Sequence, residues 1–124
     1  MSGLYGKVID DHSKRPRNKG SLDAPDAAHE DVNPLCGDRI RIELRMRDGR
    51  IAEARFGGNA CMVATASASL LTDMVRSLPP EEAAALTVER IVSEMHTELR
   101  ASRMSCAELP VSVLRGAVRQ LRKS

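Results

Sequence analysis

The clearest pattern in the chain is a strict alternation of apolar and charged side chains over residues 38–47. The apolar positions of this stretch are Ile40, Ile42, Leu44 and Met46. A period of two predicts a strand with one face in the core and the other in water. A second apolar stretch, residues 51–56, follows Asp48 and Gly49, a pair that favours a tight hairpin. We therefore predict two antiparallel strands joined at this pair.

The faces of these two strands predict their register. A two-residue turn at Asp48 and Gly49 would place Leu44 opposite Glu53 and so mix core and solvent sides. One extra residue in the connection pairs apolar positions with one another: Met46 with Ala52, Leu44 with Ala54 and Ile42 with Phe56. Because a slip of one residue would turn every side chain to the opposite face, we predict a bulged or three-residue connection with Gly49 at positive φ.

Helical patterns lie on both sides of this hairpin. Before it, residues 2–13 place Leu4, Tyr5 and Val8 at helical spacing, and a short strand is expected near residues 28–32. After it, we expect a largely buried helix over 61–78, short helices over 79–86 and 87–99, and an amphipathic helix over 107–122. This order predicts an α+β fold, in which a small antiparallel sheet of about three strands packs against a helical layer.

Length and composition limit the class of protein. A chain of 124 residues is long enough for one domain with a modest core, so we expect a single domain over 1–124. The net charge is only +2, and Tyr5 and Phe56 are the two aromatic residues of the types Phe, Trp and Tyr. Both features argue against nucleic-acid binding. No apolar run approaches the roughly 20 residues that span a bilayer, and the N-terminus lacks the order of a secretory signal. These features predict a cytoplasmic protein without a membrane partner.

The three cysteines all fall at predicted element boundaries. Cys36 stands in the irregular stretch NPLCGD, Cys61 at the start of the central helix, and Cys106 just before the last predicted helix. The thiols of a cytoplasmic protein stay reduced, and three of them cannot all form pairs. Reactivity or metal binding therefore explains them better than disulfides. The positive end of a helix dipole would favour the thiolate at Cys61 and Cys106. The alternative is that the cysteines are small buried apolar residues, which fits Cys61 best and Cys36 least.

Four stretches of the chain together resemble the NifU N-terminal-domain family, which includes the IscU and SufU proteins of iron–sulfur cluster assembly. They are LYGKVIDDHSKRPRNKG, NPLCGDRIRIEL, IAEARFGGNACMVATASASLLTDMV and RMSCAEL. The resemblance runs from about Leu4 to the end of the last helix. It implies a compact α+β domain in which Cys36, Asp38, Cys61 and Cys106 converge at one exposed end. In this family the four side chains hold iron or a transient [2Fe–2S] cluster, and zinc suits the same set.

The resemblance implies one main function and two alternatives. The main one is a non-enzymatic scaffold that accepts sulfur from a cysteine desulfurase, assembles a [2Fe–2S] cluster and passes it to apo iron–sulfur proteins. The first alternative is a zinc-dependent, SufU-like sulfurtransferase that relays persulfide sulfur without holding a cluster, and the second is a purely structural zinc domain. Cys106 and Cys36 are the candidate sulfur acceptors, and Arg103 is expected to support Cys106 by keeping it ionised.

The chain departs from the family at informative positions. Ser105 stands where the IscU branch carries a histidine directly before its third cysteine. The segment LRASRM replaces the Leu-Pro-Pro-Val-Lys segment on which the IscU chaperone docks, which argues against that partner. The insertion that SufU proteins carry between their second and third cysteines is missing, and this favours the scaffold over the sulfurtransferase.

Overall fold

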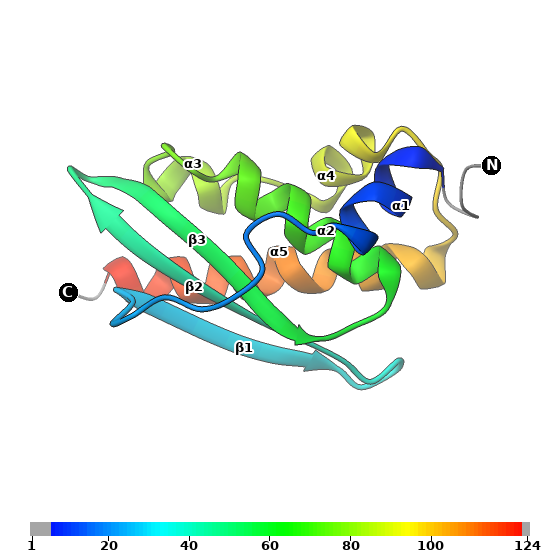
Figure 1. The fold of residues 1–124 in the computed structure, drawn as a ribbon, viewed down its shortest axis with the longest axis horizontal. Coiled ribbons are helices and arrows are strands. Elements are labelled where there is room, and N and C mark those ends of the chain that lie inside the picture. The colour runs from blue at the N-terminus through cyan, green and yellow to red at the C-terminus, as the bar shows by residue number, and fades with distance from the viewer. Residues whose placement is uncertain (1–5, 123–124) are drawn as a thin grey trace.

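The computed structural model describes residues 6–122, so the predicted helical positions Leu4 and Tyr5 lie outside the described residues. The elements follow one another as α1 (Lys7–Lys14), β1 (Ala27–Asn33), β2 (Asp38–Arg47), β3 (Arg50–Asn59), α2 (Met62–Met74), α3 (Pro80–Ala84), α4 (Val88–Met95) and α5 (Ala101–Arg122). The strands form one layer, and α2 and α5 run along the same face of it (Figure 1). The predicted α+β plan of a small sheet against a helical layer is confirmed.

The sheet is antiparallel in the order β1-β2-β3, and as far as Leu44 its β2–β3 register is the one that the apolar faces predict. Ile42 pairs with Phe56 and Leu44 with Ala54, while a register shift follows between Arg45 and Met46. The connection combines a two-residue turn, in which Gly49 has φ +78°, with a bulge. Because of the bulge, Met46 pairs with Ile51 instead of the predicted Ala52.

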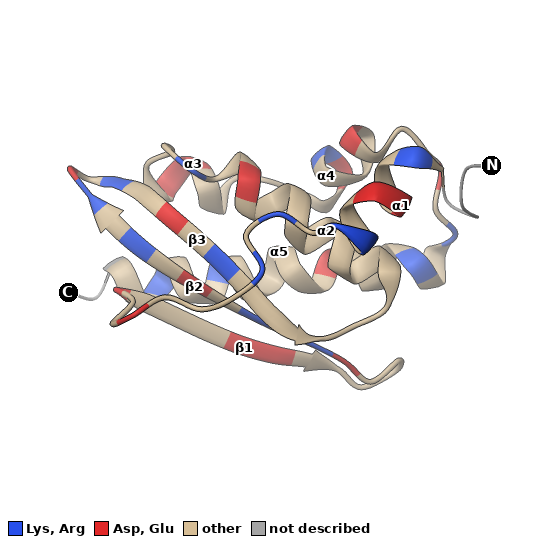
Figure 2. Ribbon diagram, viewed as in Figure 1, with Lys and Arg blue, Asp and Glu red and all other residues tan. Residues whose placement is uncertain are grey.

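The core lies between the sheet and the helices. Helix α5 packs on β1 and β2, and α2 packs on β3 and on α5. The fully buried large side chains come from both strands and helices and include Ile40, Ile42, Leu44, Ile51, Phe56, Leu71, Ile91 and Leu114. Figure 2 shows Lys, Arg, Asp and Glu residues along β2 and β3. In β2 the buried Ile40 and Ile42 alternate with the exposed Arg39 and Arg41, so the alternation in the sequence separates core from solvent there.

The helix boundaries differ from the prediction in one place that matters for function. Helix α5 begins at Ala101, so the prediction of a start at Ala107 is wrong, and Cys106 lies inside the helix. Residues 101–105 show little apolar periodicity, and Pro110 is a residue type that usually stands in the first turn of a helix. Within residues 6–122, no helix is long and apolar enough to cross a membrane.

Candidate functional site

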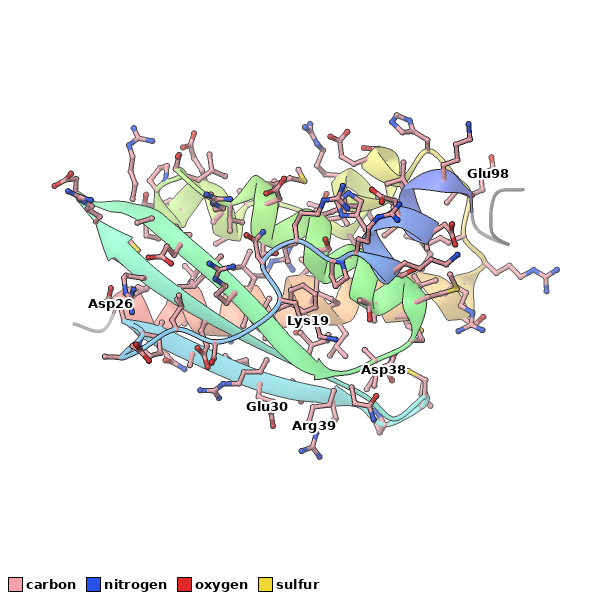
Figure 3. The ribbon with its side chains drawn as sticks, viewed as in Figure 1. Lys19, Asp26, Glu30, Asp38, Arg39 and Glu98 are labelled. Atoms are coloured by element: carbon pink, nitrogen blue, oxygen red, sulfur yellow. The ribbon has the colours of Figure 1, made fainter. Side chains whose placement is uncertain are left out.

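Two connections of the fold and the beginning of α5 meet at one end of the molecule. The turn between β1 and β2 carries Cys36, β2 begins at Asp38, Cys61 precedes α2, and Cys106 lies in the second turn of α5. Figure 3 shows Asp38 between that turn and the β3–α2 connection. One ligand atom from each of Cys36, Asp38 and Cys106 lies within 4.8 Å of the other two. Residues separated by 70 positions in the chain thus form one cluster.

The turn that carries Cys36 is fixed by Asn33. The carbonyl oxygen of Asn33 accepts hydrogen bonds from the backbone N–H groups of Cys36 at 3.3 Å and Gly37 at 2.7 Å. Its side-chain oxygen accepts a third bond, from the N–H of Leu35, at 3.0 Å. Gly37 adopts φ +74°, which glycine reaches without the steric cost that other residues meet. The Cys36 thiol is therefore exposed on an ordered turn.

Asp38 is almost fully buried, with 5% of its surface exposed. One carboxylate oxygen, Oδ1, accepts a hydrogen bond from the backbone N–H of Cys61 at 2.9 Å. The other, Oδ2, is buried and has no hydrogen-bond partner among the described residues. A buried charged oxygen without a partner is costly, and a metal cation would supply that partner.

Cys61 is the N-cap residue of α2, so its predicted place at a helix N-terminus is confirmed. Its sulfur accepts a hydrogen bond from the backbone N–H of Ala64 at 3.5 Å. The half-buried thiol lies outside the cluster of three, but it interacts with the thiol of Cys106. The β1–β2 turn, the β3–α2 connection and α5 thus bring all three thiols to the same end of the fold.

Cys106 has the opposite environment from the one predicted. It is 2% exposed, and its thiol points back along α5 to the carbonyl oxygen of Ser102 at 3.7 Å. Burial, followed by the neighbouring thiols of Cys61 and Cys36, raises the pKa of Cys106 to about 12. The expectation that a helix N-terminus would favour the thiolate of Cys106 is therefore wrong in the metal-free protein, while the supporting role of Arg103 stays a prediction.

The geometry of the cluster fits one metal ion. Two sulfurs that are each about 2.3 Å from a tetrahedral ion lie about 3.8 Å apart. The sulfurs of Cys36 and Cys106 are 3.9 Å apart. Thiolates with one carboxylate oxygen form a ligand set that suits zinc or iron, and a bound cation would also favour the ionised form of Cys106. The residues present therefore fit a metal ion at the predicted position.

The model of the NifU-like N terminal domain matches residues 4–124, which is nearly the whole chain. The chain belongs to the NifU-like N-terminal domain family. An iron-sulfur cluster assembly scaffold protein IscU from Streptococcus pyogenes is 42% identical over 77% of this chain and 58% of its own length. The zinc-dependent sulfurtransferase SufU of Bacillus subtilis is 41% identical over 77% of this chain and 63% of its own. The chain thus matches about three fifths of each of these two relatives.

The fold of this NifU-like domain is also found among solved structures. A putative iron-sulfur cluster assembly scaffold protein for the SUF system from Fervidobacterium islandicum has a TM-score of 0.82. The match covers 92% of this chain and 96% of that one, at 21% sequence identity. A likeness at this identity supports the architecture of the sheet and helices, and the chemistry of the site has to be argued from its own residues.

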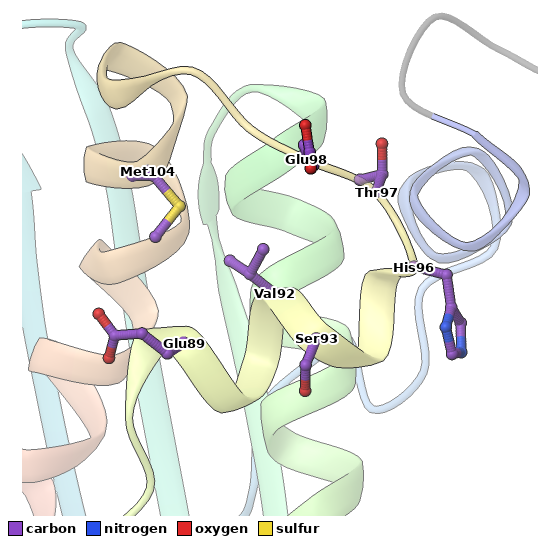
Figure 4. A pocket seen from close by; sticks show the side chains of 7 residues that line it. All are labelled: Glu89, Val92, Ser93, His96, Thr97, Glu98 and Met104. Carbon is purple, nitrogen blue, oxygen red and sulfur yellow. The ribbon is translucent and has the colours of Figure 1, made fainter.

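Two features of this NifU-like domain were missed by the sequence reasoning. Asn33 organises the Cys36 turn, and the dipeptide of Asn33 with Pro34, which marks a turn, was the available signal. A hollow of about 440 Å³ lies between α4 and the start of α5, where Val92, His96 and Met104 line it (Figure 4). No periodicity predicts this hollow, and none of the four candidate ligands lines it.

Proposed function

We propose that the protein is a scaffold on which a [2Fe–2S] cluster is assembled and from which the cluster is passed to apo iron–sulfur proteins. The observation that supports this most is the cluster formed by Cys36, Asp38 and Cys106, with their ligand atoms within 4.8 Å and one thiol open to solvent. Cys61, beside Cys106, is the fourth ligand. The [2Fe–2S] cluster is the cargo of this site, so holding it and releasing it are both part of the function.

The environments of the thiols assign different tasks to them. Cys36, exposed on its turn, is the first sulfur acceptor from a cysteine desulfurase. Its thiolate attacks the terminal sulfur of the desulfurase persulfide, a new S–S bond forms on Cys36, and the desulfurase cysteine leaves as a thiolate. Cys106, also a candidate acceptor on the sequence, is buried with a raised pKa and is better suited to holding iron.

Asp38 makes the site releasable in this proposal. Carboxylate oxygen is a harder ligand than thiolate and binds soft iron–sulfur centres less firmly. The Oδ2 atom of Asp38 is already desolvated and unpaired, so it is available to a metal without losing a protein hydrogen bond. Oδ1 meanwhile stays bonded to the N–H of Cys61, which holds the carboxylate in place.

The second candidate function is a zinc-dependent sulfurtransferase. The 3.9 Å between the sulfurs of Cys36 and Cys106 fits ligands of a single tetrahedral ion, and one relative carries this name. In that case a zinc ion would stay in the site and stabilise the thiolates, while Cys36 exchanged sulfur with its partners. Both candidates use the same residues, so metal content and cargo distinguish them.

The deciding experiment is anaerobic purification followed by metal analysis and reconstitution. The protein is incubated with ferrous iron, cysteine, a cysteine desulfurase and a thiol reductant that supplies the remaining electrons for reducing persulfide sulfur to sulfide, and the visible absorption of a [2Fe–2S] cluster is followed. We expect cluster formation and then transfer to an apo-ferredoxin. Tightly held stoichiometric zinc with persulfide on the protein and no cluster would select the sulfurtransferase, and neither metal nor cluster would reject both.

The role of Asp38 is tested with Asp38→Asn, which retains an oxygen for the N–H of Cys61 but removes the charge at Oδ2. We expect cluster transfer from this variant to be about tenfold slower, because losing a ligand alters the coordination that the acceptor must take over. The matched control is Asp31→Asn, an exposed acid near the same end of the sheet. Equal transfer rates for Asp38→Asn and the wild type would exclude Asp38 from the mechanism.

A further inference from the structure

A buried hydroxyl group ties the two helices that carry cysteine ligands to one another. The Oγ of Ser67, in the middle of α2, donates a hydrogen bond to the carbonyl oxygen of Ala107 in α5 at 2.7 Å. Neither Ser67 nor Ala107 has any exposed surface. Ala107 directly follows Cys106, and Ser67 lies on the helix that Cys61 caps. The bond therefore spans the interface between the two elements that hold these thiols.

Helix α5 lacks one backbone hydrogen bond in the turn that contains Cys106 and Ala107. Pro110 lies inside the helix, four residues after Cys106. Proline has no N–H group, so it cannot donate the usual helical hydrogen bond to the carbonyl of Cys106, and its ring crowds that carbonyl. One backbone bond of the turn is thus missing where the thiol must be placed accurately. The hydroxyl of Ser67 supplies a bond from the neighbouring helix at the adjacent carbonyl.

We infer that Ser67 is a positioning residue for Cys106: its hydrogen bond to Ala107 fixes the turn of α5 that places the Cys106 thiol beside Cys36 and Cys61. This inference deepens the proposed function, because the position of Cys106 decides how well the site binds its metal or cluster. Ser67 touches no ligand atom of the cluster and acts through the backbone of α5.

The chain provides a matched control two residues away on the same helix. Ser69 is also fully buried, but its hydroxyl faces the other side of α2. There it accepts a bond from the N–H of Arg17 at 2.8 Å and contacts Nδ1 of His12 at 2.7 Å. Ser69→Ala removes the same atom as Ser67→Ala from the same helix, and both variants gain helix propensity. Only Ser67→Ala loses the link to α5.

The experiment compares Ser67→Ala and Ser69→Ala with the wild type in two assays. The first is timed alkylation of the metal-free protein, with the rate at Cys106 divided by the rate at Cys36 in the same molecule. Loss of one buried hydrogen bond should raise this ratio about fivefold in Ser67→Ala. The second is Co²⁺ binding, followed by its absorption bands, where we expect affinity to fall about tenfold. Ser69→Ala should leave both quantities within about twofold of the wild type.

The possible results separate this inference from the proposed function. An unchanged ratio in Ser67→Ala, or a rise of all three thiol rates together, would contradict a specific role at Cys106. An equal rise in Ser69→Ala would contradict it as well, since general loosening of α2 would then be the cause. If the wild type binds no Co²⁺, the proposed metal site fails, and the alkylation ratio still decides the role of Ser67.

Discussion

The turn over residues 34–37 and the second turn of α5 place two sulfurs 3.9 Å apart in opposite environments. The Cys36 turn projects into solvent, and its neighbour Leu35 is 90% exposed. Cys106 is 2% exposed, and its pKa is raised to about 12, first by burial. Hydrogen bonds to a single residue, Asn33, hold the turn, whereas packing against the sheet and α2 holds the helix.

The difference shows that proximity alone does not make two thiols equivalent. A sulfur acceptor has to be reached by a partner and ionised, while a lasting ligand gains from a fixed position and a dry environment. The turn exposes Cys36 to a partner, and the helix gives Cys106 a fixed and dry position. The asymmetry suits the proposed function, in which one thiol receives sulfur and another holds the product.

The largest expected effect is a difference in thiol reactivity in metal-free protein at pH 7. A pKa raised to about 12 leaves very little of the Cys106 thiol ionised at pH 7, and the greater nucleophilicity of such a thiolate offsets part of this. We expect iodoacetamide to modify Cys36 about a hundredfold faster than Cys106, with half-buried Cys61 between them. Timed labelling read by peptide mass spectrometry measures the rates. Equal rates in the folded protein would remove the asymmetry, and unfolding in guanidinium should make the three rates converge.

A smaller effect is expected from Gly37→Ala in the turn. Space is not limiting, because no atom lies within 4 Å of the added Cβ, but φ is +74°. The left-handed conformation should lower the free energy of unfolding by about 1–2 kcal/mol. Urea denaturation measures the change. Gly57→Ala is the control, since its backbone is not left-handed and its nearest neighbour is at 4.0 Å. An equal loss in both variants would show that the turn has no special backbone requirement.

The smallest effect is a pH dependence that belongs to Cys106. Its pKa is raised from 9.0 to about 12 on folding, so the unfolded chain loses this proton first as pH rises. The contribution of this thiol to the free energy of unfolding is therefore fully present below pH 9. It falls as pH rises towards 12, and about 1 kcal/mol is lost by pH 10. Urea denaturation of metal-free protein at pH 8 and pH 10 measures it. Cys106→Ala should lack this loss, and an identical pH dependence in both proteins would contradict the raised pKa.

The sheet was predictable because the alternation of apolar and polar residues within each strand determines which side chains face the core. The alternation of Ile40, Ile42 and Leu44 gave the faces, and matching those faces across the hairpin gave the register and the bulge. Helix α5 was harder, because its first turn is polar and is held by tertiary contacts. Pro110 lies in the middle of the helix, where a sequence pattern predicts a beginning.

The sequence predicted that the candidate ligands converge, and the structure brings Cys36, Asp38 and Cys106 together, but their environments could not be predicted. The positions of Cys36, Cys61 and Cys106 at predicted element boundaries made them candidates, and the family resemblance added Asp38. Burial of Cys106 depends on how α5 packs against α2 and the sheet, which no local pattern records. The unpaired Oδ2 of Asp38 is likewise a result of the assembled fold.

The carboxylate of Asp38 connects the interior of the site to a signal that can be observed directly. Oδ1 accepts from the amide hydrogen of Cys61, while Oδ2 is the oxygen left for a cation. A cation at Oδ2 would draw electron density away from Oδ1 and weaken the hydrogen bond that Oδ1 accepts from this amide. The Cys61 resonance in a ¹H–¹⁵N spectrum should therefore shift when a diamagnetic ion such as Zn²⁺ binds. The intensities of this one backbone peak in its two positions would then give the fractions of metal-bound and metal-free protein in solution, without relying on visible absorption.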